Sequence, residues 1–380
     1  MDTAAYESFQ AEIFRRIWSD LDPLEQEIED REQLPLDKLM PLLAGMSALG
    51  LLVPVDYGGQ GLTIEQYLPI LAEFAKIQGG IRVLVHVHNS FAHALSEIGS
   101  ERQRQEILPG TVTGERSVAF ALTEPDHGTG RDLGTEARRD GNSYVISGRK
   151  WLITNSDIAS HFIVLARTPP AGLSAILVER DRAGLTIEPL PETMGCKGGQ
   201  HGLLTFDAVR VPADSLIGRE GDGEDHLERA LEISRVFIAA SSLGTAQRAM
   251  DVALAHARTR VTFGRPIAER QAVQRYLAEM AMDIYALRHM LLDAARKWDE
   301  GRRIPLEASL CKLFGLEAVG RVTDRALLVQ GGIGYTRGTP IERLYRDARL
   351  NWLEEGPPTV HYMVAARELA NGYAWNDAFG

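Results

Sequence analysis

Cysteine is nearly absent from this sequence of 380 residues, which contains two, Cys196 and Cys311. Two widely separated thiols can build neither a disulfide framework nor a cysteine zinc site. We therefore expect a protein of a reducing compartment, the cytoplasm.

Three further features are missing. There is no basic block, and 52 acidic residues against 41 basic ones give a net charge of -11, so nucleic acid is not an expected partner. The longest apolar run, 39–55, is interrupted by Pro41, Gly45, Gly50 and Pro54, too short and too broken for a membrane span. We interpret it as a buried helix followed by a turn. The amino-terminal MDTAAYESFQAEIFRR lacks the basic start and apolar stretch of a secretory signal.

What the chain does contain is enough apolar residues, 44%, for two or three domains. Helical patterns dominate the first part, in the stretches 6–30, 36–50, 63–78, 81–98 and a short one at 101–107. From Ser117, short β-branched runs separated by turns predict strands around 144–146, 162–166, 174–178, 186–188 and 203–206. Helical periodicity then returns. The predicted domains are helical (1–116), β (117–225) and helical (226–380).

The clearest periodic segment lies in the last of these domains. Apolar residues alternate four and three positions apart, a spacing that places them on one stripe of a helix that packs in a bundle: Val273, Leu277, Met280, Ile284, Leu287 and Leu291.

Several motifs carry weak signals on their own. GGIGYTRG (331–338) follows a helical pattern rather than a strand, which argues against a dinucleotide-binding turn. Its glycines would suit either a close approach of backbone amides to a ligand or a tight connector. His86, His88 and His93 match no zinc spacing, so no metal site is expected. GxSxG is absent, which gives a hydrolase no support.

Three stretches combine polar groups that suit a large aromatic cofactor. Hydroxyls and amides suit a ring edge rich in donors and acceptors, whereas arginine and glutamine suit a diphosphate and its sugars. Each stretch alone is more typical of ordinary surface than of a cofactor site. The stretches are AFALTEPDHGTG (119–130), with Thr123 and Thr129; GRKWLITNSD (148–157), with Trp151, Thr154 and Asn155; and RVTFGRPIAERQAVQ (260–274), with Arg260, Phe263, Arg265 and Gln271.

Taken together and in order, these and other blocks resemble the flavin-dependent acyl-CoA dehydrogenase family over nearly the whole chain. The blocks are VDYGGQGL, ILPGTVTGE, ALTEP, GRKWLITN, MGCKGG, FDAVRVP, RVTFGRPI, QGGIGY and RLYRDARLNWLEEG. The resemblance implies a mainly α fold with a central β domain: an N-terminal helical domain, a middle β-barrel or sandwich, and a C-terminal four-helix bundle. It also implies a homo-oligomer, usually a tetramer.

The resemblance implies FAD as the cofactor, held between the β domain and the bundle. The positions that match its isoalloxazine side are Leu122, Thr123, Thr129, Trp151 and Thr154. Those that match the ADP half, reached by a neighbouring subunit, are Arg260, Phe263, Gln271, Gly331 and Gly332.

The stretch NWLEEGPP (351–358) contains the residue that matches the family's base. By register this is Glu355, with Glu354 in the place that is usually aromatic. A thioester α-proton is weakly acidic, so its removal needs a desolvated carboxylate within reach while the β-hydride leaves for the flavin. The resemblance implies that the backbone N–H of Glu355 and a ribityl hydroxyl of FAD support the oxyanion, and that Arg235 and Gly356 contact the substrate. The alternative is that both acids are solvated loop residues.

Departures from the family pattern leave the affinity for FAD and the type of activity open. Leu328 replaces a usual glutamine, Pro357 a usual threonine, and Leu152 a usual aromatic residue, with Trp151 one place earlier. These departures predict weaker FAD binding, and a catalytically quiet binding protein is one alternative. A flavin oxidase or monooxygenase is another.

The substrate also stays open. The segment 128–130 reads Gly-Thr-Gly where the family has Gly-Ser-Asp, so an acyl group on a carrier protein is an alternative to acyl-CoA. Arg82 falls where glutaryl-CoA dehydrogenases place the arginine that meets a distal carboxylate, which would suit a dicarboxylic or polar acyl chain; a solvated or acid-paired arginine is the other interpretation. A separate electron-accepting flavoprotein is the expected redox partner.

Overall fold

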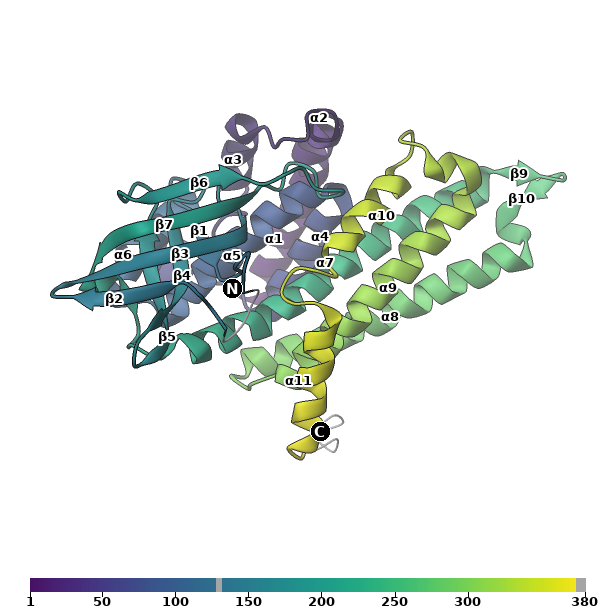
Figure 1. The fold of residues 1–380 in the computed structure, drawn as a ribbon. Coiled ribbons are helices and arrows are strands. Elements are labelled where there is room, and N and C mark those ends of the chain that lie inside the picture. The colour runs from purple at the N-terminus through teal and green to yellow at the C-terminus, as the bar shows by residue number, and fades with distance from the viewer. Residues whose placement is uncertain (128–131, 374–380) are drawn as a thin grey trace. The chain divides into compact units, whose positions relative to one another are not determined.

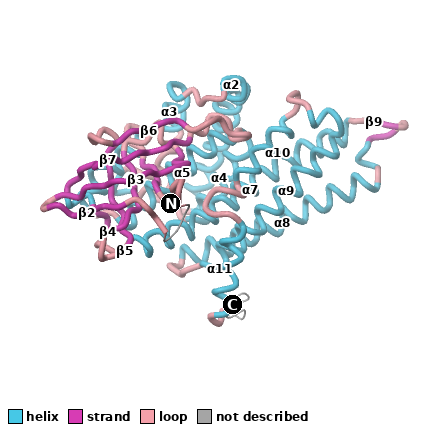
Figure 2. Tube along the Cα trace, viewed as in Figure 1, coloured by secondary structure: helices cyan, strands magenta, loops and turns pink. Residues whose placement is uncertain are grey.

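The computed structural model describes residues 1–127 and 132–373 (Figures 1 and 2). The chain separates into two compact units. Unit 1 comprises Met1–Thr63, Gly80–Thr193 and Lys197–Ala230, and unit 2 comprises Ile64–Gly79, Met194–Cys196 and Leu231–Gly380.

The helices of unit 1 begin and end at recognisable local signals. They are α1 (Thr3–Arg16), α2 (Glu25–Arg31), α3 (Leu36–Gly45), α5 (Gly79–Ile98, of which Gly79 belongs to unit 2) and α6 (Glu101–Thr113). The helix predicted over 6–30 is interrupted by a π-helical turn, Ile17–Leu21, and a 3₁₀ turn, Asp22–Leu24. The interruption coincides with Pro23, which has no N–H to continue an α-helical ladder.

Helix α6 shows how a short pattern can understate a helix. Ser100 and Gln103 form a capping box at its start, and Gly114 at φ 84° ends it. The prediction of a helix over 101–107 was too short, because the helix continues through Pro109 to Thr113. Pro109 removes one backbone donor from the helix, but the helix continues past it. It ends only at Gly114, whose left-handed conformation is incompatible with a further turn.

The sheet of unit 1 has the strand order β6-β7-β3-β2-β4-β5-β8, with β1 pairing alongside β4. Side chains alternate between faces, so Tyr144, Ile146, Phe162, Phe206 and Val211 point into one apolar core. Every predicted strand lies within an observed one. The strands are β1 (Val118–Ala121), β2 (Glu136–Asp140), β3 (Ser143–Thr154), β4 (His161–Thr168), β5 (Gly172–Glu179), β6 (Leu185–Pro189), β7 (His201–Pro212) and β8 (Leu216–Ile217).

Unit 2 is built from helices. They are α4 (Ile64–Ile77), α7 (Gly223–Thr259, of which 223–230 belong to unit 1), α8 (Gln271–Asp299), α9 (Pro305–Gln330), α10 (Pro340–Leu350) and α11 (Pro358–Ala370); β9 (Val261–Thr262) and β10 (Arg265–Pro266) form a hairpin after α7. Helices α8 and α9 run side by side (Figure 1).

The apolar stripe predicted for 273–291 lies on α8 and is confirmed. Met280 is fully buried in a core with Val319 and Val322 of α9, and Val273 and Leu277 pack against that core. Helix α7 approaches α4 so closely that a Cβ on Gly244 would lie 1.9 Å from the carbonyl oxygen of Ala72.

The predicted fold class, mainly α with a central β region, is confirmed, whereas the domain boundaries at 116/117 and 225/226 stay a prediction. Within residues 1–127 and 132–373, no helix combines the length and apolar character needed to cross a membrane.

Candidate active site

The two adjacent acids lie in the connector between α10 and α11. Residues 351–356 form successive turns, and Glu354 and Glu355 are both half-buried. Glu355 has φ 54°, in the left-handed region that non-glycine residues rarely adopt, and Gly356 follows at φ 95°. Such a conformation costs on the order of 1–3 kcal/mol and persists only where the surroundings hold it. The connector is therefore held from outside.

Lys312 of α9 is what holds it. Its side chain is fully buried, and Nζ donates to the carbonyl oxygens of Glu354 (2.5 Å) and Gly356 (3.0 Å). The ammonium thus binds the backbone on both sides of Glu355. Our sequence reasoning missed this lysine. The available signal was a lone cation in an otherwise apolar helical segment, between Cys311 and Leu313.

His361 and Arg235 complete this cluster. Nε2 of His361 lies 2.9 Å from the carbonyl oxygen of Gly356 and 3.4 Å from Nζ of Lys312. Burial, together with the charges of Lys312 and Arg235, lowers the pKa of His361 to about 3. Burial also lowers the pKa of Lys312 to about 8, although the charges of Glu354 and Glu355 oppose the shift. At pH 7 the histidine is neutral and the lysine is charged. Of the predicted residues, the structure brings Arg235, Glu355 and Gly356 into this cluster.

Unit 1 contains the segments predicted to meet the isoalloxazine. The carbonyl oxygen of Leu122 accepts a hydrogen bond from Nζ of Lys150 (2.9 Å), and that of Thr123 accepts one from the backbone N–H of Trp151 (2.7 Å). Leu122 is buried, whereas Trp151 is partly exposed. The segment after β1 is thereby tied to β3, which ends at Thr154. Thr129 lies outside the described residues.

Glu124 and Lys150 form a buried ion pair that sequence reasoning missed. The two side chains are 3% and 0% exposed, and Nζ lies 2.8 Å from Oε1. The carboxylate also accepts hydrogen bonds from the backbone N–H groups of Gly134 (2.6 Å) and Thr135 (3.0 Å). One buried anion therefore fastens both ends of the segment 124–135 to β3.

The shift of the aromatic residue to position 151 has a structural counterpart. The pairing of β3 with β7 is irregular between Lys150 and Ile153, and Leu152 has φ 59° and is 46% exposed. A bulge of this kind redirects side chains. After it, Asn155 donates from its side chain to the carbonyl oxygen of Leu84 (3.2 Å).

The residues predicted for the ADP half lie at exposed ends of helices in unit 2. Arg260 and Phe263 belong to the segment after α7, and Phe263 at the tip of the β9–β10 hairpin is 97% exposed. Gln271 is the first residue of α8. Gly331 and Gly332 follow α9 and are exposed, and within the part of the chain that the structure describes no atom lies within 4 Å of a Cβ built on either. Leu328 on α9 is 53% exposed.

Helix α5 contains Arg82 and the histidines. Arg82 is 3% exposed. His88 is fully buried, with Nε2 2.9 Å from the carbonyl oxygen of Thr111 and Nδ1 3.2 Å from Oγ of Ser117. Burial lowers the pKa of His88, so the neutral ring uses both nitrogens to join α5 to its neighbours in unit 1. His88 has a structural explanation.

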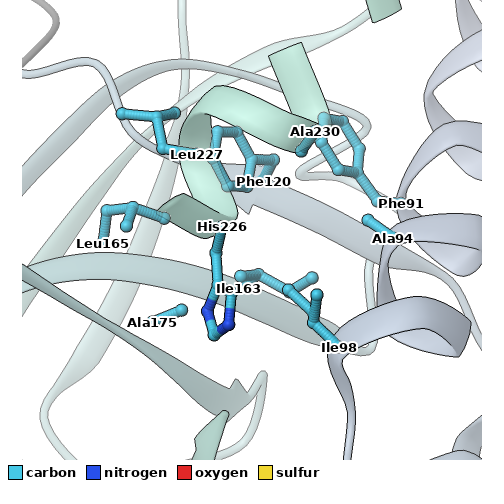
Figure 3. A pocket seen from close by; sticks show the side chains of 10 residues that line it. All are labelled: Phe91, Ala94, Ile98, Phe120, Ile163, Leu165, Ala175, His226, Leu227 and Ala230. Atoms are coloured by element: carbon cyan, nitrogen blue, oxygen red, sulfur yellow. The ribbon is translucent and has the colours of Figure 1, made fainter. Parts of the chain in front are cut away.

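A small apolar cavity lies elsewhere in unit 1 (Figure 3). Phe91 of α5, Phe120 of β1, Ile163 of β4 and His226 of α7 are among the side chains that line it. Phe91 and Phe120 stack with ring centroids 4.9 Å apart. A volume of about 10 Å³ holds one water molecule at most, so this cavity is a packing defect rather than a substrate site.

Family models match almost the entire chain. The acyl-CoA dehydrogenase N-terminal, middle and C-terminal domains match residues 3–115, 119–209 and 221–370. The chain belongs to the acyl-CoA dehydrogenase family. The resemblance drawn from the sequence is confirmed, as is the expectation of an enzyme of this family of FAD-dependent oxidoreductases.

Relatives and solved structures agree with this assignment. An acyl-CoA dehydrogenase of Bacillus subtilis (strain 168) is 33% identical over 356 residues, covering 92% of this chain and 94% of the relative. The structure of butyryl-CoA dehydrogenase from Megasphaera elsdenii superposes with a TM-score of 0.92 at 29% identity, covering 97% of this chain and 100% of that one. A prolyl acyl carrier protein oxidase superposes with a TM-score of 0.91 at 26% identity, covering 97% and 100%.

Proposed function

We propose that this acyl-CoA dehydrogenase family member converts an acyl thioester to its α,β-unsaturated form, with Glu355 as the base. The observation that carries the proposal is the connector itself: a half-buried carboxylate on a left-handed residue, whose flanking carbonyls are held by a buried ammonium. A solvated loop acid would need no such support.

The described residues fit FAD. Thr123 and Thr154 are half-buried hydroxyl residues on segments tied to each other through β3, and the exposed Trp151 and Phe263 offer apolar faces. Among the described residues, no atom lies within 4 Å of a Cβ built on Gly331 or Gly332, which leaves room for a diphosphate beside their backbone. Leu122, Arg260 and Gln271 complete the proposed set, and Thr129 is proposed on the resemblance alone. When bound, FAD would accept the β-hydride at N5.

The protein groups would manage the proton and the charge. The Glu355 carboxylate takes the α-proton, and its backbone N–H donates to the thioester oxygen as negative charge develops there. Arg235 and Gly356 would contact the substrate near this oxygen. Arg82 would meet a polar or anionic end of the acyl chain.

Carrier, partners and assembly are also proposals. We favour CoA as the carrier, and the similarity to a prolyl acyl carrier protein oxidase keeps a carrier protein as the alternative. We propose an electron-accepting flavoprotein as the redox partner and a homo-oligomer, a dimer or tetramer, as the assembly.

Flavin bleaching tests the reaction. The purified protein should contain a flavin absorbance that acyl-CoAs bleach without oxygen, and a panel of neutral and dicarboxylic acyl groups, each on CoA and on a carrier protein, should rank the substrates. Rapid reoxidation by air with peroxide formation would instead indicate an oxidase, and absence of a bound flavin a quiet family member.

Paired variants test the base. Glu355→Gln should slow bleaching by about 10²–10⁴-fold while the flavin stays bound, because that is the usual contribution of a general base. Glu354→Gln, its neighbour on the same connector, should have a modest effect. The reverse pattern would place the base one residue earlier.

A further inference from the structure

Lys312 is a buried cation to which the proposed chemistry gives no role. One nitrogen atom donates to two carbonyl oxygens, those of Glu354 and Gly356, that flank a single residue, Glu355. We propose that Lys312 is a positioning residue for the reaction: its ammonium holds the turn that aims both the Glu355 carboxylate and the Glu355 backbone N–H. This inference rests on the proposed function.

The planarity of the peptide bond gives Lys312 control of the Glu355 N–H. The carbonyl of Glu354 and the N–H of Glu355 belong to one trans peptide unit, in which they point in opposite directions. Because the carbonyl of Glu354 is directed at Lys312, the N–H of Glu355 is directed away from it. A charge-assisted hydrogen bond to that carbonyl also polarises the peptide, which strengthens its N–H as a donor.

Two attachment points are needed because the turn is conformationally unfavourable. Glu355 has φ 54° and Gly356 has φ 95°, and glycine by itself resists no rotation. Fixing the carbonyls of Glu354 and Gly356 from one atom restricts the dihedrals between them. Beyond the turn, Pro357 has φ -71° fixed by its ring, so the exit is stiff as well.

The energetics argue against a role in stability alone. Burial lowers the pKa of Lys312 to about 8, so the interior disfavours its charge relative to water. The groups that act on it come from three elements: Glu354 and Glu355 on the connector, Arg235 on α7 and His361 on α11. A neutral apolar side chain would fill the same volume without that desolvation.

Proton exchange isolates the step that Lys312 should affect. The thioester that ranks first in the substrate panel is incubated in D₂O with enzyme whose flavin has been reduced beforehand with dithionite, so that oxidation cannot follow. Uptake of deuterium at the α-carbon, measured by mass spectrometry, then reports proton removal and return alone. Glu355→Gln sets the background rate.

We expect Lys312→Met to lower this exchange at least about tenfold while leaving KM and flavin content near wild-type values, because a base displaced by about 1 Å loses up to about 10²-fold in rate. Lys297→Met is the matched control. Lys297 is also a buried lysine of unit 2, but its partners are the carboxylates of Asp293 and Glu307 rather than carbonyls of the connector, and exchange should be unchanged.

Wild-type exchange in a folded Lys312→Met protein, or an equal loss in Lys297→Met, would overturn the inference. If Lys312→Met does not fold, Lys312→Gln takes its place, because its amide stays polar but is too short to reach both carbonyls; normal exchange there would overturn it equally. Exchange that persists in Glu355→Gln, or is absent from the wild type, would instead defeat the proposed base and with it the proposed function.

Discussion

Replacing Lys150 by methionine should destabilise unit 1, because it leaves the buried carboxylate of Glu124 without its cation. Breaking such a pair typically costs about 3–5 kcal/mol. Both pKa values are lowered, with opposite effects on the charge: burial lowers the pKa of Lys150 to about 8 despite Glu124, which disfavours the ammonium, whereas hydrogen bonds from Lys150, Thr135 and Gly134 outweigh burial and hold the pKa of Glu124 below its usual value, which favours the carboxylate. Methionine avoids the free-energy cost of burying the ammonium of Lys150, and the Glu124 carboxylate keeps its two amide donors, Gly134 and Thr135. We therefore place the loss at the lower end, about 3 kcal/mol.

Urea unfolding followed by tryptophan fluorescence measures the loss, and hydrogen exchange locates it. The amides of Gly134 and Thr135 donate to Glu124, so they should exchange faster in Lys150→Met. Arg210→Met is the control, because it removes an ion pair with Asp140 that is more than half exposed on both sides and is worth about 0–1 kcal/mol. A loss in Lys150→Met no larger than in this control, with the two amides still protected, would refute the reasoning.

The remaining predictions concern unit 2. In the folded protein His361 has a pKa of about 3, whereas an unfolded histidine has a pKa of about 6.5, so only the unfolded chain gains this proton as the pH falls below 6.5. The free energy of unfolding should therefore decrease by about 2 kcal/mol between pH 6.5 and 5. His361→Leu should reduce the difference in unfolding free energy between pH 7 and 5 by that amount; an unchanged difference would show that the histidine is not the source. Gly244→Ala should cost about 1–3 kcal/mol or more, because its Cβ would lie 1.9 Å from the carbonyl oxygen of Ala72. Gly320→Ala on α9 is the control, because the nearest atom to its new Cβ would belong to Trp352, at 3.7 Å. Thermal unfolding should show this variant to be more stable than the wild type by about 0.5–1 kcal/mol. A loss as large as that of Gly244→Ala would contradict the explanation of the Gly244→Ala loss by a steric clash.

Much of the fold could be predicted because its signals are local. The stripe from Val273 to Leu291 repeats with the period of a helix, and the strands around Tyr144 and Phe162 contain the β-branched and aromatic residues that sheets favour. The predicted helix bounds were wrong near two prolines: the helix predicted over 6–30 is broken near Pro23, and the helix predicted over 101–107 continues through Pro109. Whether a proline ends a helix depends on tertiary packing and on the next stop signal, such as Gly114.

The site divides in the same way. Adjacent acids on a stiff connector are visible in the letters NWLEEGPP, and the family register selects Glu355 among them. The groups that hold the connector are not visible, because Lys312 lies 42 residues before Glu354 and on a different helix. The partner of Glu124 lies 26 residues away on β3, and although the two residues belong to the blocks ALTEP and GRKWLITN, nothing in those letters shows that they pair.

The sequence by itself indicated most of the helices and strands, because backbone propensity and side-chain spacing are encoded within a few turns of chain, and the family resemblance led to the proposal of Glu355 as the base. Only the tertiary structure decided which buried cations meet which carbonyls and carboxylates. Those pairings follow from the directions in which distant elements present their side chains, and a buried charge is stable only where packing brings its partners within hydrogen-bonding distance.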